Sequence, residues 1–531
     1  MYNLQKTFSK PEMISMSKHT FNGLLGVLLC IYSPLSTCWS QENHNESIRN
    51  PSFESDNGWR RLQTESNEYY APVHGTRYAV LNGSGNKIEQ ETSLKLSKGK
   101  SFHVTVWARS IFDENHSQQL TSPTQDYPDG TSEISHIRLE LRIGNKPLAE
   151  NEVAINPVEI LGAPREFSND DGGNIWIDGG YRHAFSESRF VQRLELDPIH
   201  DPWEIAPDFE DYQRAQEDHG AVCPVIVRDR KLLYVSTFED PEGEQEEYHA
   251  IQYIEPTGEG APNYHWPAAP PEKYENLVLS HAGDEDIIAF DPYVFFDELD
   301  QRLWMAWGGN FIAVTELNPE TGLLLHEQEN PEVMTHEKIH ARVADRATNQ
   351  EDVWTGDNEW IEGAAIYRKN DFWYLFASYG SLMTSYTIRM GRSRDPMGPY
   401  VDKDGIPLTQ FNKQKRRFGN SFFLGDDGAQ LVPGHPHFWE EDGQTFVGYD
   451  YRKSKKRVNG TEESPDIFGI RKVYWKHGWP TIWTPISVSV SAEQHPDLLG
   501  QNIVLSIENT GDPGSTVAVD NVSCSDVTHN E

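Results

Sequence analysis

The chain has 531 residues, with 46 basic and 82 acidic side chains and a formal net charge of −36 at pH 7. A surface this acidic repels a phosphate backbone, which excludes nucleic acid as an expected partner. The hydrophobic content of 37% is enough for a packed core, and the 15 Trp, 40 Gly and 32 Pro indicate a turn-rich β architecture. The length predicts two or three domains rather than one.

The first 40 residues predict an export signal. Residues 21–32, FNGLLGVLLCIY, form a short apolar run after Lys18 and His19, and small residues follow near Ser40. This run is too short to cross a bilayer, no other run is longer and as apolar, and a start at Met16 would give a more usual signal length. We therefore expect a secreted or periplasmic protein without a membrane span. The tetrapeptide LSTC leaves a surface lipoprotein as the alternative.

Residues 49–152 and 485–524 both alternate apolar and polar side chains as β-strands do. The second segment is too short to form a core of its own. The economical interpretation is one jelly roll, built from 49–152 plus 486–524, with the intervening region inserted at an exposed loop.

The inserted region, residues 160–485, repeats one pattern: an anchor residue, an apolar strand, a polar turn and an aromatic strand. Further strands follow each copy, such as SYTIRMGRS at 385–393. Repeated four-stranded units of this length are typical of propeller blades, so the chain is predicted to be all-β with a five-bladed β-propeller. The copies begin at 171, 221, 290, 361 and 434, as DGGNIWIDGGYRHAFSES, AVCPVIVRDRKLLYVSTF, FDPYVFFDELDQRLWMAWGG, IEGAAIYRKNDFWYLFASYG and GHPHFWEEDGQTFVGYDYR.

Four anchor residues carry the candidate chemistry. Asp171, Asp291, Glu362 and His435 stand at the start of the first strand of their copies, so we expect them to meet at one end of the propeller axis. Each alone would be ordinary turn chemistry. Together they are unusual, because like charges gathered in one cleft cost energy. Two carboxyl groups flanking a glycosidic bond can hydrolyse it, one as proton donor and the other as base for a water.

The segments AFDPYVFFDELDQRLWMAWGGNFIAVTELNPETG, WIEGAAIYRKNDFWYLFASYG, SYTIRMGRSRDPMGPYVDKDG, LVPGHPHFWEEDGQTFVGYDYR and HGWP resemble glycoside hydrolase family 43, especially its arabinanase-like branch. The resemblance covers about residues 165–485, most strongly blades three to five. It implies a five-bladed propeller and an inverting glycosidase that acts on arabinans, xylans or related polysaccharides.

The resemblance also implies roles for the anchor residues. Glu362 matches the family's general acid, and Asp291 matches the Asp that tunes this acid and orients the sugar. His435 matches the axial His at the substrate site, which in arabinanases often sits beside a calcium or a water. The family usually has His-Asp-Pro at the first blade, whereas this chain has Asn169-Asp170-Asp171-Gly172. Asp171 fits the spacing of the base best, and Asp170 is the next choice.

Aromatic and metal-binding candidates complete the predicted sites. Trp354 and Trp360, just before Glu362, could stack on sugar rings or pack within a blade. The split flank resembles carbohydrate-binding modules of the family 4/9 jelly-roll type, which often carry a structural calcium. Glu54 and Asp520 are candidate ligands, with a solvated Glu and a turn Asp as the alternative. No cofactor is required for the chemistry.

The expected function is that of an exported, monomeric, endo-arabinanase-like glycosidase acting on a polysaccharide. A second interpretation keeps the fold and changes the substrate to xylan, arabinofuranosyl or galactan linkages. A third is a non-catalytic, glycan-binding propeller, which the missing His-Asp-Pro favours. The sequence IHDPWEIAP contains the letters at Asp201, but no buried hairpin follows it.

Overall fold

The computed structural model is almost entirely β-strand in the parts of the chain that it describes, which confirms the predicted all-β class. Its helices there are two 3₁₀ turns, Ala492–Gln494 (η3) and Pro496–Leu498 (η4). Within these parts, no helix is long and apolar enough to cross a membrane. The predicted signal, residues 1–40, lies outside them. The described residues are 41–43, 64–65, 78–82, 84–111, 136–155, 159–160, 174–178, 181–186, 189–194, 204–205, 219–237, 249–255, 257–260, 263–265, 276–280, 288–325, 341–345, 360–381, 385–412, 414, 417–426, 430–441, 443–452, 457–458, 461–462, 467–511 and 516–528.

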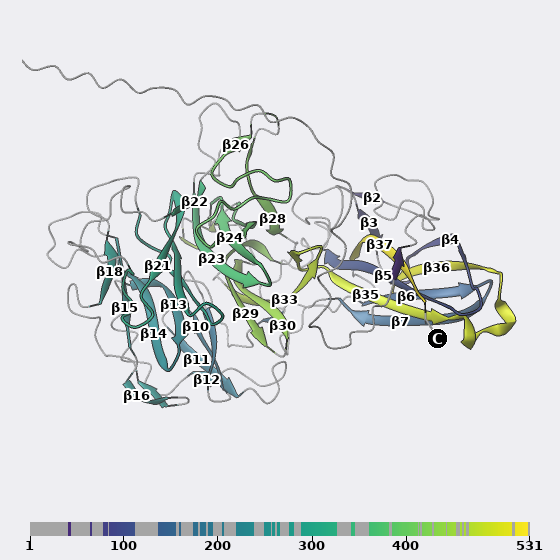
Figure 1. The fold of residues 1–531 in the computed structure, drawn as a ribbon, viewed down its shortest axis with the longest axis horizontal. Helices are drawn as coiled ribbons and strands as arrows, with labels where there is room; N and C mark the ends of the chain where they lie inside the picture. Colours follow the sequence, from purple (N-terminus) through teal and green to yellow (C-terminus); the bar gives the residue numbers. More distant parts are fainter. Residues whose placement is uncertain are drawn as a thin grey trace, which may run out of the picture. The chain divides into compact units, whose positions relative to one another are not determined.

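Two antiparallel sheets combine strands from both ends of the chain, seen in Figure 1 where purple and blue strands alternate with yellow ones. In one sheet the strands lie in the order β2, β3, β37, β5 and β35, and β1 also pairs with β37. In the other, β36 pairs with β4 and β6, and β7 follows β6. Their inward side chains form one apolar cluster. The bounds are β1 Gln41–Asn43, β2 Thr64–Glu65, β3 Tyr78–Asn82, β4 Lys87–Lys95, β5 Lys100–Ile111, β6 His136–Ile143, β7 Lys146–Ala154, β35 Thr484–Ser491, β36 Asn502–Asn509 and β37 Thr516–Thr528.

Between these flanks, the described residues form five antiparallel sheets in succession, each built on four strands in chain order, and the fifth has one strand more. The first two strands of every sheet are the hairpins expected from the repeat. The bounds are β9 Asn174–Asp178, β10 Tyr181–Ser186, β11 Arg189–Leu194 and β12 Glu204–Ile205; β13 His219–Val227, β14 Arg230–Thr237, β15 Ala250–Ile254 and β18 Leu277–Ser280; β19 Tyr293–Asp297, β20 Arg302–Trp307, β21 Phe311–Leu317 and β22 Ala341–Asp345; β23 Ile361–Lys369, β24 Phe372–Tyr379, β25 Thr387–Ser393 and β28 Ser421–Leu424; β29 Leu431–Glu441, β30 Gln444–Arg452, β33 Ile467–Lys476 and β34 Trp479–Thr481.

Three two-stranded ribbons in the described parts of the chain lie outside these sheets. They are β16 Thr257–Gly260 with β17 Asn263–His265, β26 Phe411–Asn412 with β27 Arg417–Phe418, and β31 Arg457–Val458 with β32 Thr461–Glu462.

The first strands of the five sheets contact one another in a cycle. β9 contacts β13, β13 contacts β19, β19 contacts β23, β23 contacts β29, and β29 contacts β9. The fifth sheet gains a further strand, β8 (Glu159–Ile160), which pairs with Ile470 and Gly469 of β33. One apolar cluster runs through the second to fifth sheets. Within it, Phe376 of β24 stacks on Phe438 of β29 with 4.0 Å between the ring centroids. The residues that start the first strands are therefore held by neighbouring sheets.

Candidate active site

Asp291 links three sheets. It directly precedes Pro292 and β19, has a φ of 52°, and is 6% exposed. Its backbone N–H donates to Ser236 Oγ at the end of β14 (3.0 Å), and its Oδ2 accepts the N–H of Gly363 in β23 (2.9 Å). A left-handed φ is costly for most residues but is tolerated by Asp. The turn therefore holds the Asp291 carboxylate against the strand that carries Glu362.

Glu362 stands at a bulge in β23. The register with β24 shifts between Glu362 and Ala365, and Gly363 has a φ of 52°. A Cβ at Gly363 would lie 3.1 Å from both the His435 Cα and the Ser378 Oγ, so a side chain would not fit there without movement. A bulge bends its strand and re-aims the neighbouring side chains. Here it places the Glu362 carboxyl beside Tyr386.

The Glu362 carboxyl is partly buried, and Tyr386 Oη donates a hydrogen bond to its Oε1 at 3.0 Å. Burial raises the pKa of Glu362 above its ordinary value, and the hydrogen bond from Tyr386 opposes that rise. A carboxyl with a raised pKa keeps its proton to higher pH, which is what a general acid requires.

His435 lies in β29, whose register with β30 shifts on both sides of Gly434. Its φ is 47°, and its backbone N–H donates to Ser378 Oγ at 2.8 Å. Burial lowers the pKa of His435 to about 4, so the imidazole is neutral at neutral pH. A neutral imidazole can hydrogen-bond a hydroxyl without adding a charge to the site.

Three residues of this cluster were not singled out from the sequence: Ser236, Ser378 and Tyr386. A signal for the two serines was available. In YVST and FASY they occupy the same position of the second strand of their hairpins, counted from the turn. Each accepts a backbone N–H from a residue at the start of a first strand, Asp291 and His435 respectively. Tyr386 had no comparable signal, because its contact depends on long-range packing.

The other predicted site residues are five: Asp171, Trp354, Glu54, Trp360 and Asp520. Asp171, Trp354 and Glu54 lie outside the described residues, so their predicted roles stay predictions. Trp360 is 44% exposed directly before β23, and its carbonyl accepts the Gly380 N–H at 3.2 Å. Part of its side chain therefore faces solvent.

Asp520 is fully buried in β37, and its Oδ1 accepts the N–H of Asn521 at 2.6 Å. Burial lowers the pKa of Lys476 to about 8, and the Asp520 carboxylate opposes that fall. Across the described residues, no group of three or more His, Cys, Asp or Glu side chains could hold a metal ion.

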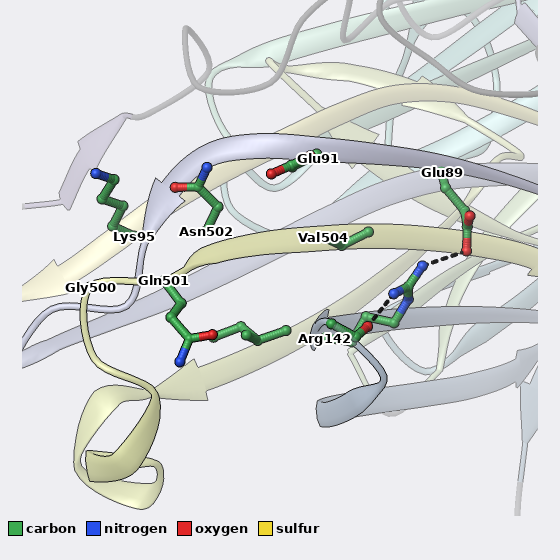
Figure 2. Close-up of a pocket in the computed structure, with 10 residues that line it drawn as sticks. Glu89, Glu91, Lys95, Arg142, Gly500, Gln501, Asn502 and Val504 are labelled. Carbon is green, nitrogen blue, oxygen red and sulfur yellow. Dashed lines mark hydrogen bonds and ion pairs between the residues drawn. The ribbon is translucent and has the colours of Figure 1, made fainter.

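A separate hollow of about 590 Å³ lies on the outer face of β4, β36 and β6, and Figure 2 shows its lining. Arg142 Nη2 contacts Glu89 Oε1 at 2.8 Å. Burial raises the pKa of Glu89, but the hydrogen bonds from Arg142 and Lys87 outweigh burial and leave the pKa lowered. Glu89 in this hollow is therefore an ionised carboxylate paired with Arg142. The polar lining comprises Glu89, Glu91, Lys95, Arg142, Gln501 and Asn502.

A comparison with protein families supports a class for this protein. Residues 273–480 match the family described as Glycosyl hydrolases family 43, and this segment contains Asp291, Glu362 and His435. The match and the curated relatives below support a glycoside hydrolase.

Several relatives are arabinan-degrading proteins. Extracellular endo-alpha-(1->5)-L-arabinanase 2 of Bacillus subtilis is 28% identical over 210 residues, which are 36% of this chain and 40% of that protein. Extracellular exo-alpha-(1->5)-L-arabinofuranosidase ArbA of Cellvibrio japonicus is 27% identical over 229 residues, 41% of this chain and 58% of that protein. The alignments thus span about half of each relative. The structure of the Cellvibrio cellulosa alpha-L-arabinanase with arabinohexaose has a TM-score of 0.44 and 18% identity, covering 64% of this chain and 99% of that one.

Proposed function

We propose that this protein is an exported, inverting glycoside hydrolase that cleaves arabinan as an endo-1,5-alpha-L-arabinosidase does. The observation that carries the proposal is the partly buried Glu362 carboxyl, with its raised pKa and its hydrogen bond from Tyr386, on the strand held by Asp291. The substrate is suggested by the printed names of the relatives, both arabinan-directed. Xylan, arabinofuranosyl and galactan linkages are the alternatives on the same fold.

The proposed architecture is a five-bladed propeller of residues 160–485 inserted in a jelly roll of 49–152 plus 486–524. The cycle of contacts among β9, β13, β19, β23 and β29 supports a closed ring. The pairing of β8 with β33 supports closure between the first and last blades. The position of β37 between β3 and β5 supports one sandwich made from both flanks.

In the proposed mechanism, Glu362 protonates the glycosidic oxygen as the bond to the anomeric carbon breaks. A water attacks that carbon from the opposite face, and Asp171 takes the proton of the water. Inversion requires roughly 6.5–9.5 Å between the acid and base carboxyl groups, which leaves room for the water. Asp291 holds the strand of Glu362 and orients the sugar, and neutral His435 hydrogen-bonds a substrate hydroxyl. The chemistry needs no cofactor because both proton-transfer groups are side chains.

Trp354 and Trp360 are proposed to stack on sugar rings next to the acid. The exposed face of Trp360 favours this role over packing in a blade. The jelly roll is proposed to assist binding of the polysaccharide, and the protein is proposed to act as a monomer. A structural calcium at Glu54 and Asp520 stays a prediction.

The experiment is hydrolysis of a panel of arabinan, xylan, galactan and aryl glycosides, with the anomer of the first product followed by NMR. We expect cleavage of arabinan with inversion, and loss of hydrolysis in Glu362→Gln. Glu298→Gln is the matched control, because Glu298 is an exposed residue in the turn between β19 and β20. Hydrolysis retained in Glu362→Gln would refute the assignment of the acid. A folded protein that binds glycans and cleaves none would support the non-catalytic interpretation.

A further inference from the structure

Tyr386 is held rigidly against Glu362. It precedes β25, is 3% exposed, and donates its hydroxyl hydrogen to Glu362 Oε1 at 3.0 Å. Its ring lies against Gly434 of β29, where a Cβ would fall 1.9 Å from Cε1 and 2.1 Å from Cδ1. The backbone of the fifth sheet therefore fixes a ring whose hydroxyl reaches a carboxyl of the fourth sheet.

We propose that Tyr386 is a positioning residue that makes Oε1 of Glu362 a permanent acceptor and thereby assigns the transferable proton to Oε2. The proposal rests on the proposed function, because it concerns the acid of that reaction.

The donor and acceptor atoms of the two side chains decide which oxygen of Glu362 carries the proton. A protonated carboxyl has one carbonyl oxygen and one hydroxyl oxygen, and a phenol hydroxyl donates to the carbonyl oxygen. Among the described residues, the hydrogen bond found on the Glu362 carboxyl is the one to Oε1. Burial, together with the nearby Glu362 and Asp291 carboxyls, raises the pKa of Tyr386 well above its ordinary value. The hydroxyl therefore keeps its proton and donates throughout the working pH range.

The same hydrogen bond strengthens during the reaction. When Glu362 gives up its proton, the acceptor becomes a carboxylate, and hydrogen bonds to ionised acceptors are roughly twice as strong as neutral ones. An interaction that is stronger in the transition state than in the ground state raises kcat rather than lowering KM. Tyr386 thus acts on proton transfer through Glu362, without contact with the substrate.

The test is Tyr386→Phe, which keeps the ring on Gly434 and removes the hydroxyl. We expect kcat on arabinan to fall about 10- to 100-fold with KM nearly unchanged, the size expected for one hydrogen bond to a charged group. Loss of a donor to the carboxylate raises the pKa of Glu362, so the basic limb of the pH profile moves to higher pH. Aryl glycosides with acidic leaving groups lose less activity, because they need little protonation.

Tyr400→Phe is the matched control. Tyr400 is fully buried, and its hydroxyl donates to the carbonyl of Pro396 at 2.8 Å, away from the acid. We expect it to show the loss of stability of a buried tyrosine hydroxyl without a shift of the pH profile. Equal shifts in both variants, or a pH profile and leaving-group dependence unchanged in Tyr386→Phe, would overturn the proposal.

A readout that does not depend on hydrolysis separates this inference from the proposed function. The carboxyl stretching band of protonated Glu362 is identified in the infrared spectrum by its loss in Glu362→Gln, and is then titrated. A higher pKa in Tyr386→Phe than in the native protein supports the positioning role, and an unchanged or lower pKa refutes it. If the native protein hydrolyses none of the glycosides but the pKa of Glu362 is still higher in Tyr386→Phe, the proposed function is refuted and the positioning role of Tyr386 stands.

Discussion

Two substitutions of Asp291 separate its structural work from its chemical role. Asn accepts the left-handed φ of 52° and can still accept the Gly363 N–H through its amide oxygen. Ala does neither. It incurs about 1–2 kcal/mol for the left-handed backbone and leaves a buried N–H unsatisfied at about 1–3 kcal/mol. We therefore expect Asp291→Ala to lower the free energy of unfolding by about 2–5 kcal/mol, and Asp291→Asn by about 1 kcal/mol or less.

Urea unfolding followed by tryptophan fluorescence measures both values, and arabinan hydrolysis measures the chemical role. We expect Asp291→Asn to stay folded, because it keeps the backbone conformation and the bond to Gly363. We expect it to lose most of its kcat, because Asn carries no charge. If Ala and Asn destabilise the protein equally, the turn at Asp291 does not depend on its φ or on the bond to Gly363. If Asp291→Asn retains full activity, the Asp291 carboxylate has no part in the reaction.

Three further predictions concern the same cluster. Because burial raises the pKa of Glu362, the basic limb of the kcat/KM profile should lie above pH 4.5, the ordinary pKa of a Glu carboxyl, and activity should be lost as pH rises through that limb. A limb at or below pH 4.5 would contradict the burial of the acid. Gly434→Ala should displace the Tyr386 ring, cost about 1–3 kcal/mol or more in thermal unfolding, and lower kcat. Gly443→Ala, where a Cβ meets nothing within 4 Å, should cost about 1–2 kcal/mol for its positive φ and leave kcat unchanged. An unchanged kcat in Gly434→Ala would refute the close packing against Tyr386. The pKa of His435 is lowered from 6.5 to about 4, so between these pH values the unfolded chain binds more protons than the folded protein. The free energy of unfolding should therefore fall by up to about 3 kcal/mol as the pH drops through this window. His435→Gln should remove this effect.

The repeat and the strand positions could be predicted because their signals are local. Alternating apolar residues and polar turns fix each hairpin, and the common phase of the hairpins placed Asp291, Glu362 and His435 at equivalent strand starts. In the structure, Asp291 is hydrogen-bonded to the Gly363 N–H on the strand of Glu362, and His435 is hydrogen-bonded to Ser378, which pairs with Glu362 across β23 and β24.

The contact between Tyr386 and Glu362 could not be predicted in this way. It depends on the lack of a side chain at Gly434, 48 positions after Tyr386 in the chain, and on the bulge that turns Glu362. Neither feature has a periodic signature. Burial is the leading cause of the raised pKa of Glu362 in the structure, whereas the resemblance implied that Asp291 tunes this acid.

The backbone at the strand starts shows how the site is kept in place. Asp291, Val432 and His435 all have φ values near 50°, a region that costs non-glycine residues free energy. Such conformations persist only where the surroundings over-determine them. Here the surroundings are the hydrogen bonds from Asp291 and His435 to serines of preceding sheets, because each first strand is tied to its neighbour. The contacts between neighbouring sheets therefore also set the position of the acid. We expect a change that loosens these contacts to lower activity before the protein unfolds.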